Sequence, residues 1–485
     1  MLKYLQQEAN LTHTENGALT HSTSGSFCLD LFFRAGAMRN ASEQEIADVV
    51  TRSFVENAMK TLKIIFFVRD VRGGLGERRF FRIAMRTLTT IAPEAVARNV
   101  SYFPEYGRFD DLCTLLHTPC ENVAVKEIKK QLDADKLAMQ NGESASLLAK
   151  WLPSVNASSQ ETRRNGCHLA SLLGMTECNY RKLLASLRRY TDILENRLRE
   201  KDYTFDYGKQ PSKAMFKYRQ AFWRNDEERY SSFLDSVEHG NAELKTSTLY
   251  PYEIVRRCFT QITEKELRSL DLTWKNLPDY GENTENAIAV IDGSGSMTWG
   301  ERVRPLDVAL SLGIYFAEHN KGAFAKHFIT FSRRPRLVKI TGTDIVEKVR
   351  YCSTFNEVAN TDLEAVFDLI LSTALKHHVP QEELPHRIYI ISDMEFDGCV
   401  IGGNEQTLYT EMKKRYSEWG YTLPQVVFWN VNSRSSNMPV TMRENGTALI
   451  SGFTPALFDM IIADELSPVR IMEEVISNER YARIA

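Results

Sequence analysis

The segment Ala287–Met297 constrains the fold most, because an apolar run there ends in a carboxylate followed by glycines and serines. The run Ala287–Ile291 is short, partly β-branched and bounded by turn-forming residues, which predicts a buried strand. Asp292 then falls at the carboxyl end of that strand, where open α/β sheets bind their ligands. Ser294 and Ser296 follow at alternate positions, separated by a glycine that allows a tight turn. One carboxylate and two hydroxyls are hard oxygen ligands, which suit Mg²⁺.

The composition is that of an ordinary soluble protein. A chain of 485 residues predicts two or three domains, and 43% hydrophobic and 25% charged residues are typical of globular proteins. The net charge of −3 supplies no global attraction to nucleic acid or membranes, so any such binding must use a local patch. The eight cysteines form no CxxC pair, which favours reduced thiols over a structural zinc site.

Targeting signals are not apparent in the sequence. Polar residues interrupt the first eight positions, so no signal peptide is expected. No run of about 18 apolar residues exists, so we expect no membrane-spanning segment and no membrane partner. The simplest expectation is a cytoplasmic protein.

The chain divides into regions with different sequence patterns. Residues 1–26 are polar and predict a loose lead-in. From 27 to 270, helical patterns recur almost without strand patterns, which predicts an all-α helical-repeat module of HEAT-like type. Ser42 and Glu45 have the spacing of a capping box at the start of one such helix. The polar stretch 271–285 is the best candidate for a linker.

Strand and helix patterns alternate over residues 286–485. This alternation predicts an α/β domain of Rossmann-like type, with a mostly parallel sheet and helices on both faces. The expected strands are 287–291, 326–331, 336–340, 387–392, 425–431 and 448–451.

Oxygen ligands recur at two other places in this domain. Thr361 lies just before a predicted helix, at or beside its N-cap. Asp393 ends a second apolar strand, as Asp292 ends the first. The sequence therefore predicts one site at the sheet edge, formed by Asp292, Ser294, Ser296, Thr361 and Asp393. It would hold Mg²⁺, or Mn²⁺ or Ca²⁺, with a position open for an oxygen of a partner. For the triplet alone, a simple Gly-Ser turn is the alternative.

This pattern resembles the metal-ion-dependent adhesion site of von Willebrand A domains. That family has Asp-x-Ser-x-Ser after its first strand, a threonine in a loop before a helix, and an aspartate at the end of its fourth strand. The resemblance implies that Ser294, Ser296 and Thr361 ligate the metal directly or nearly so, and that Asp292 and Asp393 often act through water. Asp397 is either a group supporting this site or a plain loop carboxylate.

Enzymes are the competing class. A strand ending in aspartate also begins haloacid-dehalogenase-like phosphatases, but those need a second aspartate where Ser294 stands. A serine nucleophile would need a histidine base, and none of the histidines has a recognisable catalytic context: His319, His327, His377, His378 and His386. We expect a non-enzymatic protein, with a Mg²⁺-dependent nuclease or phosphatase left open.

Two segments of the helical region are basic. Arg69–Arg86 holds six arginines against two acids, a net charge of +4, beside glycines whose N–H groups favour anions. Glu161–Arg229 holds 15 Lys/Arg against 10 Asp/Glu, a net charge of +5, with aromatics on which bases could stack. The simpler interpretation is paired surface charges and core aromatics, which we favour for Phe216 and Phe222. The candidate phosphate contacts are Arg72, Arg78, Arg79, Arg163, Arg164, Lys213 and Lys217.

Several motifs resemble an uncharacterised two-module family, in which a helical domain of unknown function precedes a von Willebrand A domain. They are Asn16–Thr20, Leu29–Phe33, Arg69–Arg78, Pro104–Leu112, Ala149–Ser154 and Thr248–Val255. Through Arg-Asp-x-x-Gly-Gly and Tyr-Gly-Arg-x-Asp-Asp-Leu the chain also resembles, more distantly, the Ro ribonucleoprotein (TROVE-module) family. That resemblance implies a helical scaffold binding small structured or single-stranded RNA. The alternative is a protein-interaction module whose metal captures an acidic residue of a partner.

Overall fold

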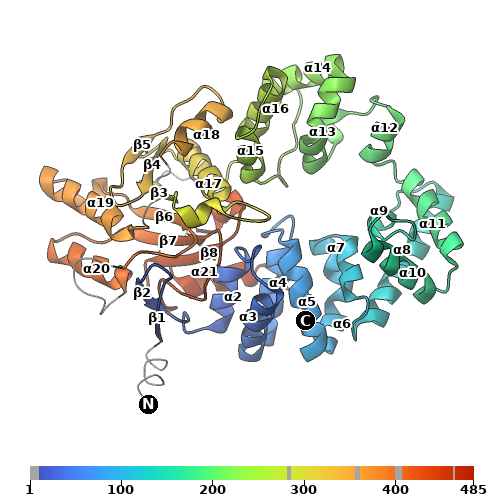
Figure 1. The fold of residues 1–485 in the computed structure, drawn as a ribbon, viewed down its shortest axis with the longest axis horizontal. Coiled ribbons are helices and arrows are strands. Elements are labelled where there is room, and N and C mark those ends of the chain that lie inside the picture. Colours follow the sequence, from blue (N-terminus) through green and yellow to red (C-terminus); the bar gives the residue numbers. More distant parts are fainter. Residues whose placement is uncertain (1–9, 281–285, 356–360, 399–406, 462–464) are drawn as a thin grey trace. The chain divides into compact units, whose positions relative to one another are not determined.

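The computed structural model describes residues 10–280, 286–355, 361–398, 407–461 and 465–485 (Figure 1). They form two compact units. The α/β unit comprises Met1–Ile64 and Ser236–Ala482, and the helical unit comprises Ile65–Asp235 and Arg483–Ala485. This division differs from the boundaries 27–270 and 286–485 expected from the sequence, because the first helices and residues 236–280 belong to the same compact unit as residues 286–482.

The α/β unit is built on a six-stranded sheet in the order β5-β4-β3-β6-β7-β8. Its strands are β3 (Ala287–Asp292), β4 (His327–Phe331), β5 (Leu337–Lys339), β6 (Arg387–Ser392), β7 (Gln425–Asn430) and β8 (Thr447–Ser451). All pairings are parallel except that of the edge strand β5 with β4. Each strand expected from the sequence is therefore confirmed, and the order is that of doubly wound nucleotide-binding folds.

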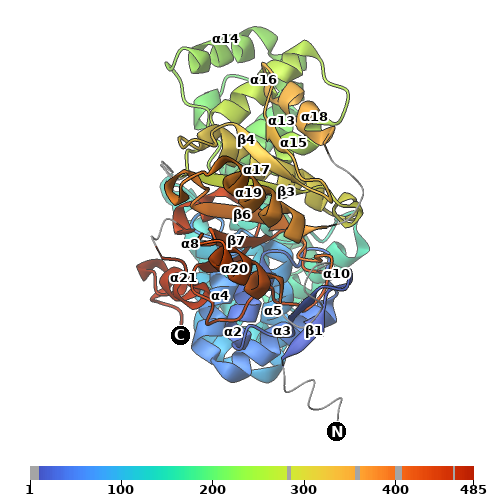
Figure 2. The same ribbon diagram turned by 90° about the vertical axis from the view of Figure 1, so that its left-hand side faces the viewer.

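Helices cover both faces of this sheet, as the alternation predicts. Helix α17 (Pro305–His319) packs on β3 and β6. Helices α19 (Leu363–His377) and α20 (Leu408–Glu418) pack on each other and lie on the opposite side of the sheet, as Figures 1 and 2 show. The unit also contains α18 (Ile345–Ser353) and α21 (Pro468–Ile476).

The polar N-terminal stretch is not a loose lead-in over its described part, residues 10–26. It forms an antiparallel pair, β1 (Leu11–His13) and β2 (Leu19–His21). The Thr20 hydroxyl donates to the carbonyl oxygen of Met438 at 2.7 Å, so the pair is bonded to the α/β unit. Polarity misled the prediction here, because these side chains are satisfied by the sheet region and not by water.

Two N-terminal helices extend the same unit. Helix α2 (Phe27–Ala35) packs on β8, and Ser451 accepts a hydrogen bond of 3.0 Å from the N–H of Gly36. Helix α3 (Glu43–Glu56) begins with the capping box predicted from Ser42 and Glu45.

The expected linker 271–285 is helical at its start. Helix α16 (Glu264–Lys275) is capped by Thr263 and runs into it, after α15 (Pro251–Cys258). Trp274 is buried, and its Nε1 donates to Glu318 Oε2 at 2.7 Å. The helix continues because this apolar face has a partner to pack on; residues 281–285 lie outside the described part.

The helical unit contains no strand in residues 65–235, which the structure describes in full. The chain enters this unit along α4 (Ala58–Arg69) and leaves it along α14 (Glu227–Glu238). The others are α5 (Arg78–Ile91), α6 (Pro93–Asn99), η1 (Val100–Tyr102), α7 (Phe103–Tyr106), η2 (Phe109–Leu115), α8 (Glu121–Asn141), α9 (Leu148–Trp151), α10 (Gln160–Leu172), α11 (Glu177–Tyr190), α12 (Leu194–Glu200), η3 (Tyr207–Lys209) and α13 (Ser212–Asn225). Among the described helices of the chain, none is long and apolar enough to cross a membrane.

Candidate functional site

Asp292 ends β3 at the point where the strand order reverses. The chain continues from β3 to β4 on one side, whereas β6 lies on the other side of β3. Ile291 pairs with Ile391 in register, so the residues that follow these two strands emerge next to each other. Such a switch point, outside the carboxyl ends of the strands, is where doubly wound sheets bind ligands.

Asp292 is fully buried and held by two hydrogen bonds. Its Oδ1 accepts from the N–H of Ser294 at 2.9 Å, and its Oδ2 accepts from the hydroxyl of Ser392 at 2.5 Å. Burial, reinforced by the nearby carboxylate of Asp393, raises the pKa of Asp292 to about 7. Ionising both carboxyl groups at this site is therefore unfavourable, because water cannot screen their charges there.

The two serines lie at the start of the short helix η4 (Gly295–Thr298). Ser294 Oγ and Ser296 Oγ are 3.1 Å apart. Ser294 is buried and Ser296 is half-buried, so the pair lies between the carboxylate and the surface. The local sequence produces this arrangement, because the turn after β3 brings alternate side chains back toward the strand end.

Thr361 is buried and is attached to the loop that follows β6. Its hydroxyl is shared between the carbonyl oxygen of Glu395, 2.7 Å away, and Asp397 Oδ1, 3.0 Å away. It also accepts a hydrogen bond of 2.8 Å from the side-chain amide of Asn16. The structure therefore ties Thr361 to the Asp393–Asp397 loop and to the N-terminal stretch.

Asp393 is buried beside Arg434, a cation that no sequence motif singled out. Arg434 Nη1 lies 3.4 Å from Asp393 Oδ2, and the same guanidinium pairs with Glu15. Burial raises the pKa of the neighbouring Glu395, which accepts hydrogen bonds from the backbone N–H of Glu15 and from Ser435. A divalent ion at this edge would therefore share Asp393 with an arginine.

The N-terminal stretch is the part of the site that the sequence reasoning missed. Asn16 also donates to the carbonyl oxygen of Glu395 at 2.7 Å. The available signal was Asn16-Gly17 between the two Leu-Thr-His repeats, because Asn-Gly flanked by alternating residues is a strong hairpin signal. Gly17 has a φ of +91°, a left-handed conformation that favours glycine, within the five-residue loop that joins β1 to β2.

The donor set fits a hard divalent cation. Asp292, Ser294, Ser296, Thr361 and Asp393 offer oxygen atoms only, and the two carboxylates are buried together. A cation would offset the burial and the repulsion from Asp393 that together raise the pKa of Asp292. Asp292, Ser294, Ser296 and Asp393 lie together at the switch point, whereas the contacts of Thr361 are with the loop after β6 and with Asn16.

The seven basic candidates all lie in the helical unit. Arg79 is half-buried. The other six are exposed: Arg72, Arg78, Arg163, Arg164, Lys213 and Lys217. They fall on three elements, namely the start of α5 with the loop before it, helix α10 and helix α13.

Some of the aromatics expected between these cations are core residues. Phe205, Tyr207 and Phe222 are buried and pack on one another, with ring centroids 5.1 to 6.0 Å apart. They are not available for stacking with bases, and the preference for a core role of Phe222 is confirmed. Phe216 is half-buried, and the Arg219 guanidinium lies 4.2 Å from its ring.

The motifs Arg69–Arg78 and Pro104–Leu112 pack against each other. Arg69 is buried, and its Nη2 lies 2.7 Å from Asp111 Oδ2. A Cβ at Gly74 would lie 2.0 Å from a carbonyl oxygen of the preceding helix. These residues therefore hold the start of the helical unit together, and Arg69 is not a surface cation.

Comparisons with known proteins give two domains of unknown function and one full-length relative. A family described as a domain of unknown function (DUF2828) matches residues 14–133 and 159–280, and a second (DUF7788) matches residues 286–481. The chain is 30% identical to the "Uncharacterized protein L728" of Acanthamoeba polyphaga mimivirus over 515 aligned positions, which cover 96% of this chain and 87% of that protein. Among solved structures, the RO (RSR) protein of Deinococcus radiodurans matches with a TM-score of 0.35 and 13% identity, over 93% of both chains.

Proposed function

The chain belongs to the family of the uncharacterized mimivirus protein L728, and we propose that it is a non-enzymatic scaffold with two binding surfaces. The first is a Mg²⁺ site of the adhesion type in the α/β unit, which docks an oxygen of a partner. The second is the basic surface of the helical unit, which binds RNA in a Ro-like manner. In this proposal the α/β unit is a von Willebrand A domain and the helical unit a HEAT-like repeat array.

One observation carries the metal site: two buried carboxylates follow adjacent parallel strands, next to two serine hydroxyls. The hydrogen-bond donors to Asp292 are the uncharged N–H of Ser294 and hydroxyl of Ser392, and burying a carboxylate without a compensating charge is costly. Asp292, Ser294 and Ser296 would hold the ion, with Asp393 and Thr361 completing its surroundings. Mg²⁺ keeps several waters, so one position stays open for a carboxylate or phosphate oxygen.

A docking role is favoured over catalysis. Ser294 occupies the place where a phosphatase of the haloacid-dehalogenase type has its acid. His319 and His327 use Nδ1 to contact backbone carbonyl oxygens, at 2.8 and 2.7 Å, which is the role of capping side chains.

Mg²⁺ titration by calorimetry tests the site. We expect binding in the native protein and its loss in Asp292→Asn. Asp135→Asn is the matched control, because Asp135 is another buried carboxylate, bonded to Ser146 in the helical unit. Equal Mg²⁺ binding by the native protein and Asp292→Asn would reject the site.

Charge segregation supports RNA binding by the helical unit. Residues 65–235 hold 28 Lys/Arg against 22 Asp/Glu, a net charge of +6, although the whole chain has −3. Positive charge on one unit is the electrostatic footprint of a nucleic-acid partner. Exposed Arg163, Arg164, Lys213 and Lys217 would contact phosphates, with Arg72, Arg78 and Arg79 beside them.

Filter binding with single-stranded and structured RNA at low salt tests this surface. Reversing Arg163 and Arg164 to Glu should weaken binding and lower the salt slope, which is about 0.7–0.9 per phosphate contact. Lys413→Glu with Lys414→Glu is the matched control, a pair of exposed adjacent cations on α20 of the α/β unit. Binding that is absent at low salt, or that falls equally in both double variants, would reject RNA as the partner.

A protein partner is the second candidate, and Trp299 favours it. This side chain is 80% exposed and lies three residues after Ser296. Exposed tryptophans are enriched among the residues that anchor protein interfaces. If a partner carboxylate binds the metal, a chelator and Trp299→Ala should each abolish a pull-down of that partner. RNA binding by the helical unit should survive both treatments.

A further inference from the structure

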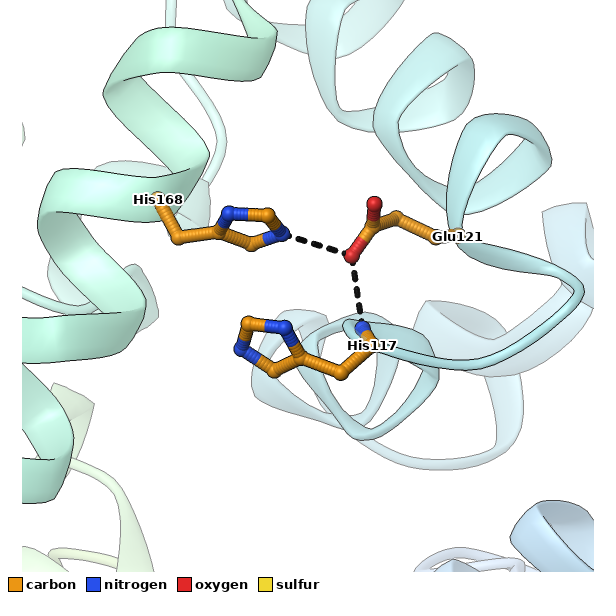
Figure 3. Close-up of side chains that lie close together, drawn as sticks. All are labelled: His117, Glu121 and His168. Carbon is orange, nitrogen blue, oxygen red and sulfur yellow. Dashed lines mark hydrogen bonds and ion pairs between the residues drawn. The ribbon is translucent and has the colours of Figure 1, made fainter.

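Two histidines and a glutamate meet in the helical unit: His117 and Glu121 are four positions apart, and His168 lies 47 positions after Glu121. His117 lies between η2 and α8, Glu121 is the first residue of α8, and His168 lies on α10. One ligand atom from each lies within 4.8 Å of the other two. Figure 3 shows the three side chains converging, with both rings on the same side of the carboxylate.

Glu121 organises this cluster. Its Oε2 accepts a hydrogen bond of 2.6 Å from the backbone N–H of His117 and lies 2.7 Å from His168 Nε2. His117 has a φ of +62°, so the chain adopts a left-handed conformation to place this N–H on the carboxylate. These two contacts hold the Glu121 carboxylate toward both histidines.

The two rings are stacked, with centroids 4.2 Å apart and an angle of 23° between their planes. His117 Nε2 lies 3.3 Å from Asn165 Oδ1. Because an amide oxygen only accepts hydrogen bonds, this contact places the proton on Nε2 and leaves the lone pair on Nδ1. In Figure 3 that nitrogen, the one nearer the main chain, lies on the side of the ring facing the other two residues.

We propose that His117, Glu121 and His168 form a binding site for a divalent transition metal such as Zn²⁺ or Co²⁺. Imidazole nitrogens suit these ions and not Mg²⁺. Two histidines and one carboxylate leave a fourth, open position for water or an anion, as in three-ligand zinc sites. Asn165 would then hold the unused nitrogen of His117, which is the usual arrangement for a ligating histidine.

Binding requires small local movements. Metal bonds of about 2.0–2.1 Å in a tetrahedron place ligand atoms roughly 3.3 Å apart, so the contact between His168 and Glu121 must lengthen by about 0.6 Å. The His168 ring must carry its proton on Nδ1 instead of Nε2. One ring must also tilt out of the stack, and His117 is exposed, so its tilt displaces mainly water.

The metal would join the start of α8 to the middle of α10. Ligands that bind only the folded state raise its stability by mass action. The bound ion should therefore raise the melting temperature of the helical unit.

Titration of untagged full-length protein with Zn²⁺ and Co²⁺, in excess Mg²⁺ to saturate the oxygen site, tests this proposal. We expect saturable binding with a Co²⁺ visible spectrum that indicates nitrogen ligands. His168→Ala and Glu121→Gln should each weaken binding at least tenfold, and His377→Ala, which removes an exposed histidine of the α/β unit, should not. Glu121→Gln keeps an oxygen that accepts the hydrogen bond from the N–H of His117. The variant therefore removes the carboxylate ligand without removing the contact that holds the loop at His117.

Zn²⁺ affinity that is the same in native, Glu121→Gln and His168→Ala protein would overturn the proposal, as would the absence of any metal-induced rise in melting temperature. Asp292→Asn should bind Zn²⁺ as the native protein does. Failure of the oxygen site and failure of this site are therefore distinguishable.

Discussion

The side-chain amide of Asn16 donates a hydrogen bond of 2.8 Å to the hydroxyl of Thr361, across 345 positions of sequence. The same amide donates to the carbonyl oxygen of Glu395. Asn16 thereby fastens the N-terminal hairpin to the loop that bears Asp393, at the edge where we propose the metal site. The hairpin is part of the candidate site and not an appendage to it.

Asn16→Ala removes both of these hydrogen bonds and leaves two acceptors poorly satisfied. We expect a loss of about 1–3 kcal/mol in the free energy of unfolding, because each net hydrogen bond contributes roughly 0.5–1.5 kcal/mol. Denaturant titration measures it. Asn122→Ala, an exposed residue of α8, is the control and should change stability by less than about 0.5 kcal/mol. Equal stability of the two variants would contradict the anchoring role.

Ser296→Ala should weaken Mg²⁺ binding without unfolding the protein, because Ser296 is half-buried and only its hydroxyl would contact the ion. We expect at least a tenfold loss of affinity, equivalent to about 1.4 kcal/mol, measured by calorimetry. Ser311→Ala is the matched control, since Ser311 is buried in α17 and its hydroxyl donates to a backbone carbonyl oxygen. If both variants bind Mg²⁺ equally, Ser296 is not a ligand.

Asp111→Ala should destabilise the helical unit strongly. Asp111 is buried and contacts the guanidinium groups of Arg69 and Arg82, so its removal leaves a buried cation without its carboxylate. Breaking such a pair costs about 3–5 kcal/mol, which thermal or chemical unfolding will show. Asp110→Ala is the neighbouring control: Asp110 is less buried, and we expect a smaller loss. A loss at Asp110 as large as that at Asp111 would mean that burial is not the cause.

The buried carboxyl group of Asp30 should make the stability of the protein depend on pH. Burial raises the pKa of Asp30 above its ordinary 3.8, even though Ser24 and Thr23 donate hydrogen bonds to it. The unfolded chain therefore releases this proton at a lower pH than the folded chain does, and stability falls as the pH rises from about 3.8 to the folded value. Asp30→Asn should remove this fall. The free energy of unfolding is measured for the native protein and for Asp30→Asn at several pH values. As the pH rises, the variant should gain stability relative to the native protein. A difference between the two that stays constant with pH would contradict the prediction.

Much of the α/β unit could be predicted from the sequence. Apolar runs with turn residues at their ends gave the strands, and β5 pairs with β4 as the two runs suggested. Asp292 and Asp393 were expected at one edge because the carboxyl ends of parallel strands meet there. The polar stretch 10–26 and the start of the linker were misjudged, because their side chains are satisfied by distant parts of the fold and not by their neighbours.

The sequence by itself determined the local elements and the oxygen atoms that end two of the strands. Hydrophobic periodicity, helix capping and turns depend on residues within a few positions of one another. Asp292, Ser294 and Ser296 also lie within a few positions of one another. Only the tertiary structure decided that Asn16 reaches Thr361, that Arg434 lies beside Asp393, and that His117, Glu121 and His168 converge. Apart from the local pair His117 and Glu121, those contacts join residues that are distant along the chain, and each depends on how whole elements pack, which no local pattern encodes.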